Sequence, residues 1–358
     1  MASSELEDDA ERARSAIVDC DLHLLTMSLD ELKKRLPRRY QSRGLTIAAP
    51  GYENPHGRHI DDDRFEFEGG LAPETVKEFH LDPYDVDIGI VTGSTVMMGV
   101  SHHPNRAYAS AVARAHNEYV ADRWLPSDDR FRASVLVAPQ DPERAAELIH
   151  EFGSRPGFVQ VIMGSSSDEA YGHPKFWPVY EAAVEEDLPV AIHTSNDGAG
   201  ISNHATPGTP SNYFAWHNML PSAYMGHVNS LIVEGVFEEF PGLRFVCIEG
   251  GFAWVPHLMW RMDKNWKGLR DQAPWLTKPP SEYIREHVRF TTQPVAEPDR
   301  PEHLLQMFEM MHADETLMFS SDFPHWDIDD PRLALPNETP KDLARRIFSE
   351  NAIDLYDL

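Results

Sequence analysis

The chain alternates short apolar runs with longer segments that have a helical period. Eight runs rich in valine and isoleucine have the length and composition of buried strands: "SAIVDCDLH", "VDIGIVTG", "RASVLVAP", "GFVQVIMG", "LPVAIHTS", "LRFVCIEGG", "HVRFTTQP" and "ETLMFSSD". Between them lie helical patterns such as "DPERAAELIHEF", where Asp141 precedes a proline at the first helical position. Eight β/α units predict a (β/α)8 TIM barrel, with a doubly wound open sheet as the alternative.

Two segments interrupt this repeat, at about residues 40–81 and 195–227. Each follows a predicted strand, so in a barrel both would leave from the C-terminal rim, where barrel enzymes build their sites. The aromatic residues of the second favour a packed lid or a subunit contact over a disordered loop. We therefore expect one domain over residues 1–358, with an acidic tail at residues 1–14 and two rim inserts.

The first predicted strand carries an unusual set of polar residues. In "IVDCDLHLL", Asp19, Asp21 and His23 alternate with apolar residues. Residues two apart on a strand point to the same face, so the three side chains are expected to project together. Asp19 lies deeper in the strand than the other two, which favours a supporting role over direct metal binding.

Further polar residues stand where other predicted strands end. His193 ends the fifth strand, Glu249 the sixth and Asp322 the eighth, and His325 follows closely. Singly, they also fit a core histidine, a strand-end acceptor and a turn cap. Their common position at one barrel mouth favours a shared cation, because buried carboxylates and imidazoles are costly without one. Carboxylate and imidazole donors indicate Zn, Mn or Fe rather than copper or a cluster.

Composition limits the partners of the chain. A formal charge of −26 argues against nucleic acid and against anionic membrane surfaces, because both attract basic proteins. Cys20 and Cys247 lie within apolar runs, so a disulfide framework is not expected. The start "MASSELEDDAERARS" lacks a signal-peptide core, and no apolar run has the length of a membrane span. We expect a cytoplasmic protein.

Motifs along nearly the whole chain resemble the amidohydrolase superfamily, in the branch that includes aminocarboxymuconate semialdehyde decarboxylase and resorcylate-type decarboxylases. The similar segments are "VDCDLH", "PQDPERAAELI", "YGHPKFWPVYEAAVEEDLPVAIH", "EGVFEEFPGLRFVCIEGGFAW", "RFTTQP", "FSSDFPHWD" and "ENAIDLYDL". The resemblance implies a metal-dependent (β/α)8 barrel. It also implies that Asp21 and His23 are the first-strand ligands, His193 the fifth-strand ligand and Asp322 the eighth-strand ligand.

The sequence departs from this family pattern at two ligand positions. Asp21 stands where many relatives have a histidine, and Glu249 replaces a sixth-strand histidine thought to act in the decarboxylases. His217, at the start of the helical stretch "AWHNMLPSAYMGHVNSLIVEGVF", and His325 extend the candidate ligands. A helix-core or subunit-contact role for His217 stays open. The seven candidates are Asp21, His23, His193, His217, Glu249, Asp322 and His325, which are enough for two metals.

Three functions follow from this ligand set. The Glu-Gly-Gly motif resembles non-haem metal monooxygenases such as 2-aminoisobutyrate hydroxylase. This favours a dinuclear Fe or Fe/Mn oxygenase that uses dioxygen to hydroxylate a small organic substrate, for example an amino acid. The alternative is a Zn- or Mn-dependent hydrolase or non-oxidative decarboxylase, with Glu249 or Asp322 as catalytic base. The third is a supporting subunit of a paralogous catalytic barrel, and the family resemblance implies a homodimer or such a heteromer.

Overall fold

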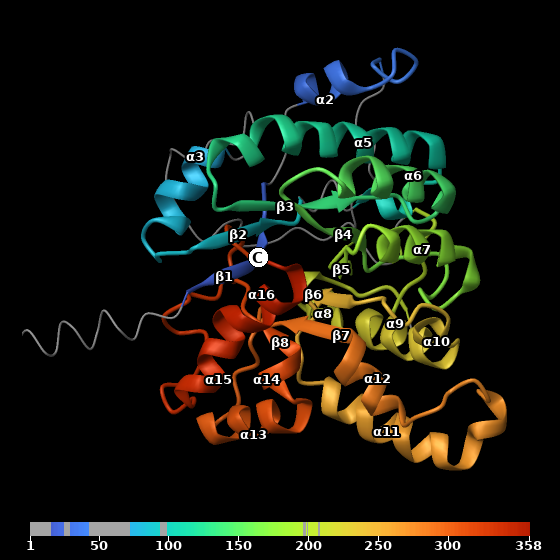
Figure 1. The fold of residues 1–358 in the computed structure, drawn as a ribbon, viewed down its shortest axis with the longest axis vertical. Coiled ribbons are helices and arrows are strands. Elements are labelled where there is room, and N and C mark those ends of the chain that lie inside the picture. The colour runs from blue at the N-terminus through green and yellow to red at the C-terminus, as the bar shows by residue number, and fades with distance from the viewer. Residues whose placement is uncertain are drawn as a thin grey trace, which may run out of the picture.

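Eight parallel strands form one sheet in chain order (Figure 1). The computed structural model describes residues 16–24, 29–42, 72–93, 99–195, 198, 200–206 and 208–358. The strands are β1 (Val18–Leu22), β2 (Ile88–Val91), β3 (Phe131–Leu136), β4 (Phe158–Gly164), β5 (Val190–His193), β6 (Phe245–Ile248), β7 (Val288–Thr291) and β8 (Leu317–Met318). Seven of the eight predicted apolar runs contain one of these strands completely, and β3 begins one residue before the third run.

The sheet curves round so that the chain after β8 meets β1. The backbone N–H of Cys20 donates to the carbonyl of Phe319 at 3.0 Å, and that of His23 donates to Phe323 at 2.9 Å. Leu22 and Phe323 form a parallel bridge. These contacts nearly close the barrel and confirm the predicted (β/α)8 TIM fold.

Helices surround the barrel and bury their apolar faces against it (Figure 1). In α6, buried Ala145, Leu148, Ile149 and Phe152 follow the helical spacing, and Pro142 occupies the first turn. The helices are α2 (Leu29–Arg35), α3 (Pro73–Val76), α5 (Arg106–Arg123), α6 (Pro142–Gly153), α7 (Trp177–Glu185), α8 (Tyr213–His217), α9 (Pro221–Val233), α10 (Val236–Glu239), α11 (Val255–Leu269), α12 (Pro280–His287), α13 (Pro301–Met311), α14 (Ala313–Thr316), α15 (Lys341–Arg345) and α16 (Asn351–Tyr356). No helix in these described ranges combines the length and apolar composition of a bilayer span.

The two predicted inserts are described to different extents. Residues 43–71 of the first insert lie outside the described residues, and its end forms α3 and the π-helical turn η1 (Lys77–Leu81). The second contains α8 and the beginning of α9. The expected continuous helix from Ala215 onward is instead broken between His217 and Pro221. The extent of the domain stays a prediction.

Candidate metal centre

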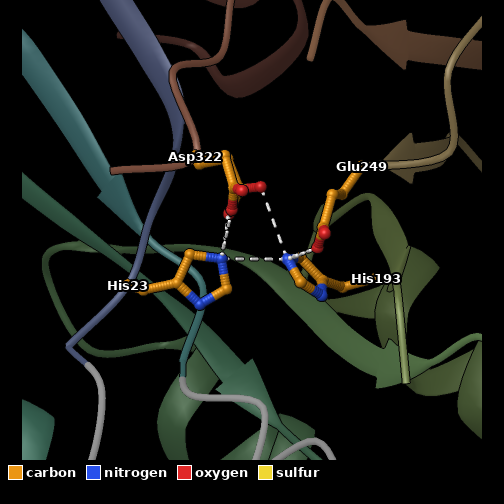
Figure 2. Close-up of side chains that lie close together, drawn as sticks. His23, His193, Glu249 and Asp322 are labelled. Carbon is orange, nitrogen blue, oxygen red and sulfur yellow. Dashed lines mark hydrogen bonds and ion pairs between the residues drawn. The ribbon is translucent and has the colours of Figure 1, made fainter. Parts of the chain in front are cut away.

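Five of the seven predicted ligands meet at the mouth of the barrel. They are Asp21, His23, His193, Glu249 and Asp322, all buried, and each offers a donor atom within 4.8 Å of the others. Four of these side chains point toward a common centre in Figure 2. Because they come from β1, β5, β6 and the segment after β8, parallel strands ending at one rim explain how they meet.

The spacing of the donor atoms is that of a site for a divalent metal ion. The Nε2 atom of His23 lies 2.9 Å from Asp322 Oδ1 and 3.4 Å from Asp21 Oδ1. The Nε2 atom of His193 lies 3.0 Å from Glu249 Oε2 and 3.4 Å from Asp21 Oδ2. The two imidazole Nε2 atoms are 3.2 Å apart. The lone pairs of these nitrogen and oxygen atoms therefore face one point, as the donors of a metal site do.

The hydrogen bonds of His193 explain why a cation belongs there. Its Nδ1–H donates to the carbonyl of Thr194 at 2.9 Å, so in the neutral ring Nε2 carries a lone pair. That lone pair faces carboxylates, and burial would lower the pKa of His193. The carboxylates of Asp21 and Glu249 outweigh burial and raise the pKa well above its ordinary value. Either a proton or a metal ion bound at Nε2 would supply the positive charge that these carboxylates favour.

Two carboxylate oxygens support the same conclusion. Asp21 Oδ2 and Asp322 Oδ2 are buried and receive no hydrogen bond from the residues that the structure describes. Buried carboxylate oxygens normally have a partner. Burial opposes ionisation of Asp21, but His193, His23 and a hydrogen bond from Thr92 lower its pKa to about 2. An ionised, incompletely bonded carboxylate is a suitable metal ligand, and the donor set as a whole fits a hard or borderline divalent ion.

His325 lies against the group but outside it. Its Nδ1 is 2.8 Å from Asp322 Oδ1, and its ring lies 4.2 Å from that of His23. Burial would lower the pKa of His325, but Asp322 raises it to about 9. A protonated His325 and one divalent ion together balance the charges of the three carboxylates in the group. His325 is therefore placed to neutralise a ligand.

His217 is also outside the group. Its Nε2 lies 3.4 Å from Asp327 Oδ2, and its ring stacks on that of Tyr213 at a centroid distance of 5.3 Å. The sequence pattern placed His217 near the mouth of the barrel, but the break after α8 turns its imidazole toward Asp327. His217 and His325 thus lie beside the five gathered donors and are not among them, and their role as metal ligands stays a prediction.

Asp19 has the supporting position that its depth in the strand predicted. It accepts hydrogen bonds from His80 at 2.7 Å and from both the backbone and hydroxyl of Ser321 at 2.9 and 2.5 Å. These bonds fix β1 to the segment that carries Asp322. His80, Ser321 and Thr92 were not predicted from the sequence, because nothing local marks a polar residue whose partner is far along the chain.

The turns that follow β6 and β8 each contain a residue with an uncommon backbone conformation. Glu249 and Asp322 have φ values of 57° and 64°, in the left-handed region that non-glycine residues rarely adopt. Such conformations cluster at functional sites, where the surrounding structure enforces them. After Glu249, a Cβ atom at Gly250 would lie 2.7 Å from the ring of Tyr224, so the motif needs glycine there.

A cavity of about 410 Å³ lies beside Glu249. Its apolar lining consists mainly of Leu220, Pro221, Phe252, Trp254, Pro294 and Val295. Its polar lining includes His217, Asn218 and Glu249, and no lysine or arginine is among the described lining residues. The cavity is largely apolar and meets the candidate metal centre at Glu249.

Comparison with known proteins gives relatives of known activity. The gamma-resorcylate decarboxylase of Rhodococcus jostii (strain RHA1) is 26% identical over 243 residues, covering 62% of this chain and 68% of the relative. The 2-keto-4-carboxy-3-hexenedioate hydratase of Sphingobium sp. (strain NBRC 103272 / SYK-6) is 31% identical over 191 residues, covering 50% of this chain and 49% of the relative.

Solved structures share the fold. The 5-carboxyvanillate decarboxylase of Novosphingobium aromaticivorans, complexed with manganese and 4-hydroxy-3-methoxy-5-nitrobenzoic acid, superposes with a TM-score of 0.72. It is 21% identical, and the match covers 97% of each chain. At this identity the likeness shows the barrel alone.

The preference for a monooxygenase is wrong. It came from the glutamate at the end of the sixth strand and from a count of seven ligands. The relatives found by sequence comparison include decarboxylases of gamma-resorcylate, and solved structures of the fold include 5-carboxyvanillate decarboxylase, so the comparisons favour decarboxylation over oxygenation.

The sequence profile of the amidohydrolase family matches residues 18–358, from the first strand of the barrel to the last residue. The match therefore includes every strand and all five gathered side chains. The chain belongs to the amidohydrolase family.

Proposed function

We propose that the protein is a metal-dependent, non-oxidative decarboxylase of a small aromatic or unsaturated carboxylic acid. The observation that carries this proposal is the buried group of Asp21, His23, His193, Glu249 and Asp322 beside an apolar cavity. The decarboxylases among its relatives support the reaction type.

We infer that these five side chains hold one ion and that manganese fits them well, because three of the five donors are carboxylates. Manganese in solved structures of the same fold supports this choice. When held by these side chains, a divalent ion would supply Lewis-acid chemistry to an acidic substrate. In this proposal the predicted catalytic residues Glu249 and Asp322 act as ligands.

Residues around the ligands fix their orientation before substrate arrives. Thr92 donates to Asp21 Oδ1 at 2.6 Å, Thr194 holds the Nδ1 of His193, and His325 holds Asp322. Partners of this kind set the orientation and basicity of metal ligands. The ligand geometry therefore needs little reorganisation during turnover.

The cavity limits the substrate class. With no lysine or arginine among its described lining residues, the cavity offers few groups that would bind a second anionic group of the substrate. The single carboxylate of the substrate would then lie at the centre, and the ring would lie against residues such as Trp254 and Pro294. An apolar wall also excludes water from the carboxylate, which favours loss of neutral carbon dioxide.

The first test is a turnover assay under nitrogen. Protein loaded with manganese would be incubated with hydroxybenzoic acids that carry one carboxylate, including 2,6-dihydroxybenzoate, while carbon dioxide and product are measured. We expect equimolar release of carbon dioxide that stops after treatment with a chelator and returns with manganese. No release from any acid by protein loaded with manganese, zinc or iron would refute the proposal.

Hydration is a second candidate, favoured by the hydratase relative, which has the higher identity over about half of the chain. The same centre would then lower the pKa of a bound water. Mass spectrometry separates the two reactions, because hydration adds the mass of water to the substrate and decarboxylation removes that of carbon dioxide.

A further inference from the structure

Decarboxylation replaces a carboxylate on carbon with hydrogen, so the site needs a group that delivers a proton to that carbon. Among the described residues lining the cavity, His217 and Glu249 are the titratable ones. Glu249 belongs to the proposed ligand group. This leaves His217 as the proton carrier that faces the substrate.

We propose that His217 donates the proton and that Asp327 is its positioning residue, an inference that rests on the proposed function. The Nε2 of His217 lies 3.4 Å from Asp327 Oδ2. Both side chains are largely shielded, with 20% and 16% of their surfaces exposed. A carboxylate at this distance orients the imidazole through one nitrogen, which leaves Nδ1 for the substrate.

Aromatic side chains hold the imidazole in place. The ring of Tyr213 stacks on His217 with an interplanar angle of 21°, and Trp326 lies 6.1 Å away between ring centroids. The indole N–H of Trp326 donates to the Tyr213 hydroxyl at 3.3 Å. His217 comes from the insert after β5, whereas Trp326 and Asp327 follow β8. The pair therefore forms where two rim segments meet over the cavity.

The step balances in atoms and electrons. The bond between the carboxylate and the substrate carbon breaks, and its electron pair stays with that carbon. The carbon takes the proton from the His217 imidazolium, carbon dioxide leaves, and neutral His217 regains a proton from solvent. No oxidant or reductant is needed.

The test compares H217Q and D327N with the wild type and with H303Q, a control that replaces an exposed histidine of α13. For each protein, kcat, KM and the manganese content per chain are measured with the best acid of the turnover assay. We expect H217Q to lower kcat about 10²- to 10⁴-fold, the usual contribution of a positioned acid or base. KM and manganese content should change little, and H303Q should match the wild type.

The pH dependence of kcat distinguishes a proton donor from a residue that only supports the structure. A general acid must be protonated, so the kcat of the wild type should fall at alkaline pH, and this limb should disappear in H217Q. D327N should lower kcat less than H217Q, because the imidazole stays in place as a donor and loses only the carboxylate that orients it.

The outcomes separate the two proposals. An inactive wild type would refute the proposed function, and this inference with it. An active wild type with an equally active H217Q would overturn the inference alone. Loss of manganese in H217Q would also overturn it and return His217 to the ligand role, and a raised KM at unchanged kcat would make it a binding residue.

Discussion

At the residue scale, the polar positions of β1 divide into two tasks. Asp21 and His23 face the other predicted ligands, whereas Asp19 joins β1 to the segment after β8. The two-residue period of a strand predicts their common face. It does not predict partners such as Ser321, which lies 302 positions from Asp19. Side chains that support the ligands are therefore invisible without the fold.

The hydroxyl of Thr92 is expected to tune metal affinity through Asp21. Thr92→Val keeps the shape of the side chain but removes the hydrogen bond to Asp21 Oδ1. We expect manganese affinity to fall about 10- to 100-fold, as for other partners of metal ligands. Competition with a chelator measures it. Thr316→Val is the matched control, since Thr316 is also buried and its hydroxyl donates to the carbonyls of Met311 and His312. Equal manganese affinities in the two variants would contradict the prediction.

His227 should make stability depend on pH. Its Nε2–H donates to the carbonyl of Ser165 at 2.7 Å and its Nδ1 accepts from the backbone N–H of Tyr171 at 3.1 Å, so the folded protein needs the neutral ring. Burial lowers its pKa to about 4. Unfolded chains bind this proton near pH 6.5. The folded state binds fewer protons, so this contribution is complete above pH 6.5 and is lost as pH falls toward 4.

The corresponding measurement is urea unfolding of the wild type and H227Q at pH 7.5 and pH 4.5. Between pH 7.5 and pH 4.5 the free energy of unfolding should fall more for the wild type than for H227Q. The expected difference is up to ~3 kcal/mol, since each unit of pKa shift corresponds to about 1.4 kcal/mol. The difference between the proteins removes contributions from other groups. Parallel pH dependences in both proteins would show that His227 does not carry the effect.

At the scale of elements, the turn after β6 explains the Glu-Gly-Gly motif by packing. Tyr224 of α9 lies against Gly250, and its hydroxyl donates to the carbonyl of Ile248. The amide of Glu249 is also bonded, to the Thr291 hydroxyl at 3.1 Å. These contacts hold Glu249 in its left-handed conformation. Gly250 is thus a packing requirement of the turn, which explains this glycine of the motif without oxygen chemistry.

Gly250→Ala should disturb both stability and the metal centre. The added methyl would lie 2.7 Å from the Tyr224 ring, and relieving such a contact costs about 1–3 kcal/mol. The shift should also weaken manganese binding, because Glu249 is the neighbouring residue. Gly268→Ala in α11 is the control, since nothing lies within 4 Å and alanine favours helix. Thermal unfolding and manganese titration measure both effects, and a stable Gly250→Ala with normal affinity would contradict this explanation.

The α8 and α9 segment shows where helical periodicity is insufficient. The sequence predicts one helical stretch, but Pro221 begins a new helix and the chain turns at residues 218–220. A proline favours the first turn of a helix and disfavours its interior. Periodicity shows that His217 is near a helix end, but its direction depends on contacts with Tyr213 and Asp327 from the folded rim.

At the scale of the whole molecule, the barrel followed from eight apolar runs at regular intervals, and parallel strands then placed five ligands at one rim. The reaction did not follow in the same way. A list of histidines and carboxylates says how many donors exist, whereas the number of ions depends on distances among them. Five side chains within 4.8 Å of one another form one candidate centre, whereas the decarboxylases among the relatives corrected the oxygenase prediction.

That centre should also stabilise the barrel, because its ligands come from opposite ends of the chain. Without an ion, three buried carboxylates repel one another at the rim. A ligand that binds only the folded state at 100 times its Kd adds about 2.7 kcal/mol. At about 2.1 cal/mol/K per residue, this raises Tm by roughly 4 °C for a chain of this size. Calorimetry after chelation and after manganese addition measures the shift. Asp322→Asn should reduce it strongly, and an unchanged Tm in the wild type would show that the ligands are stable without an ion.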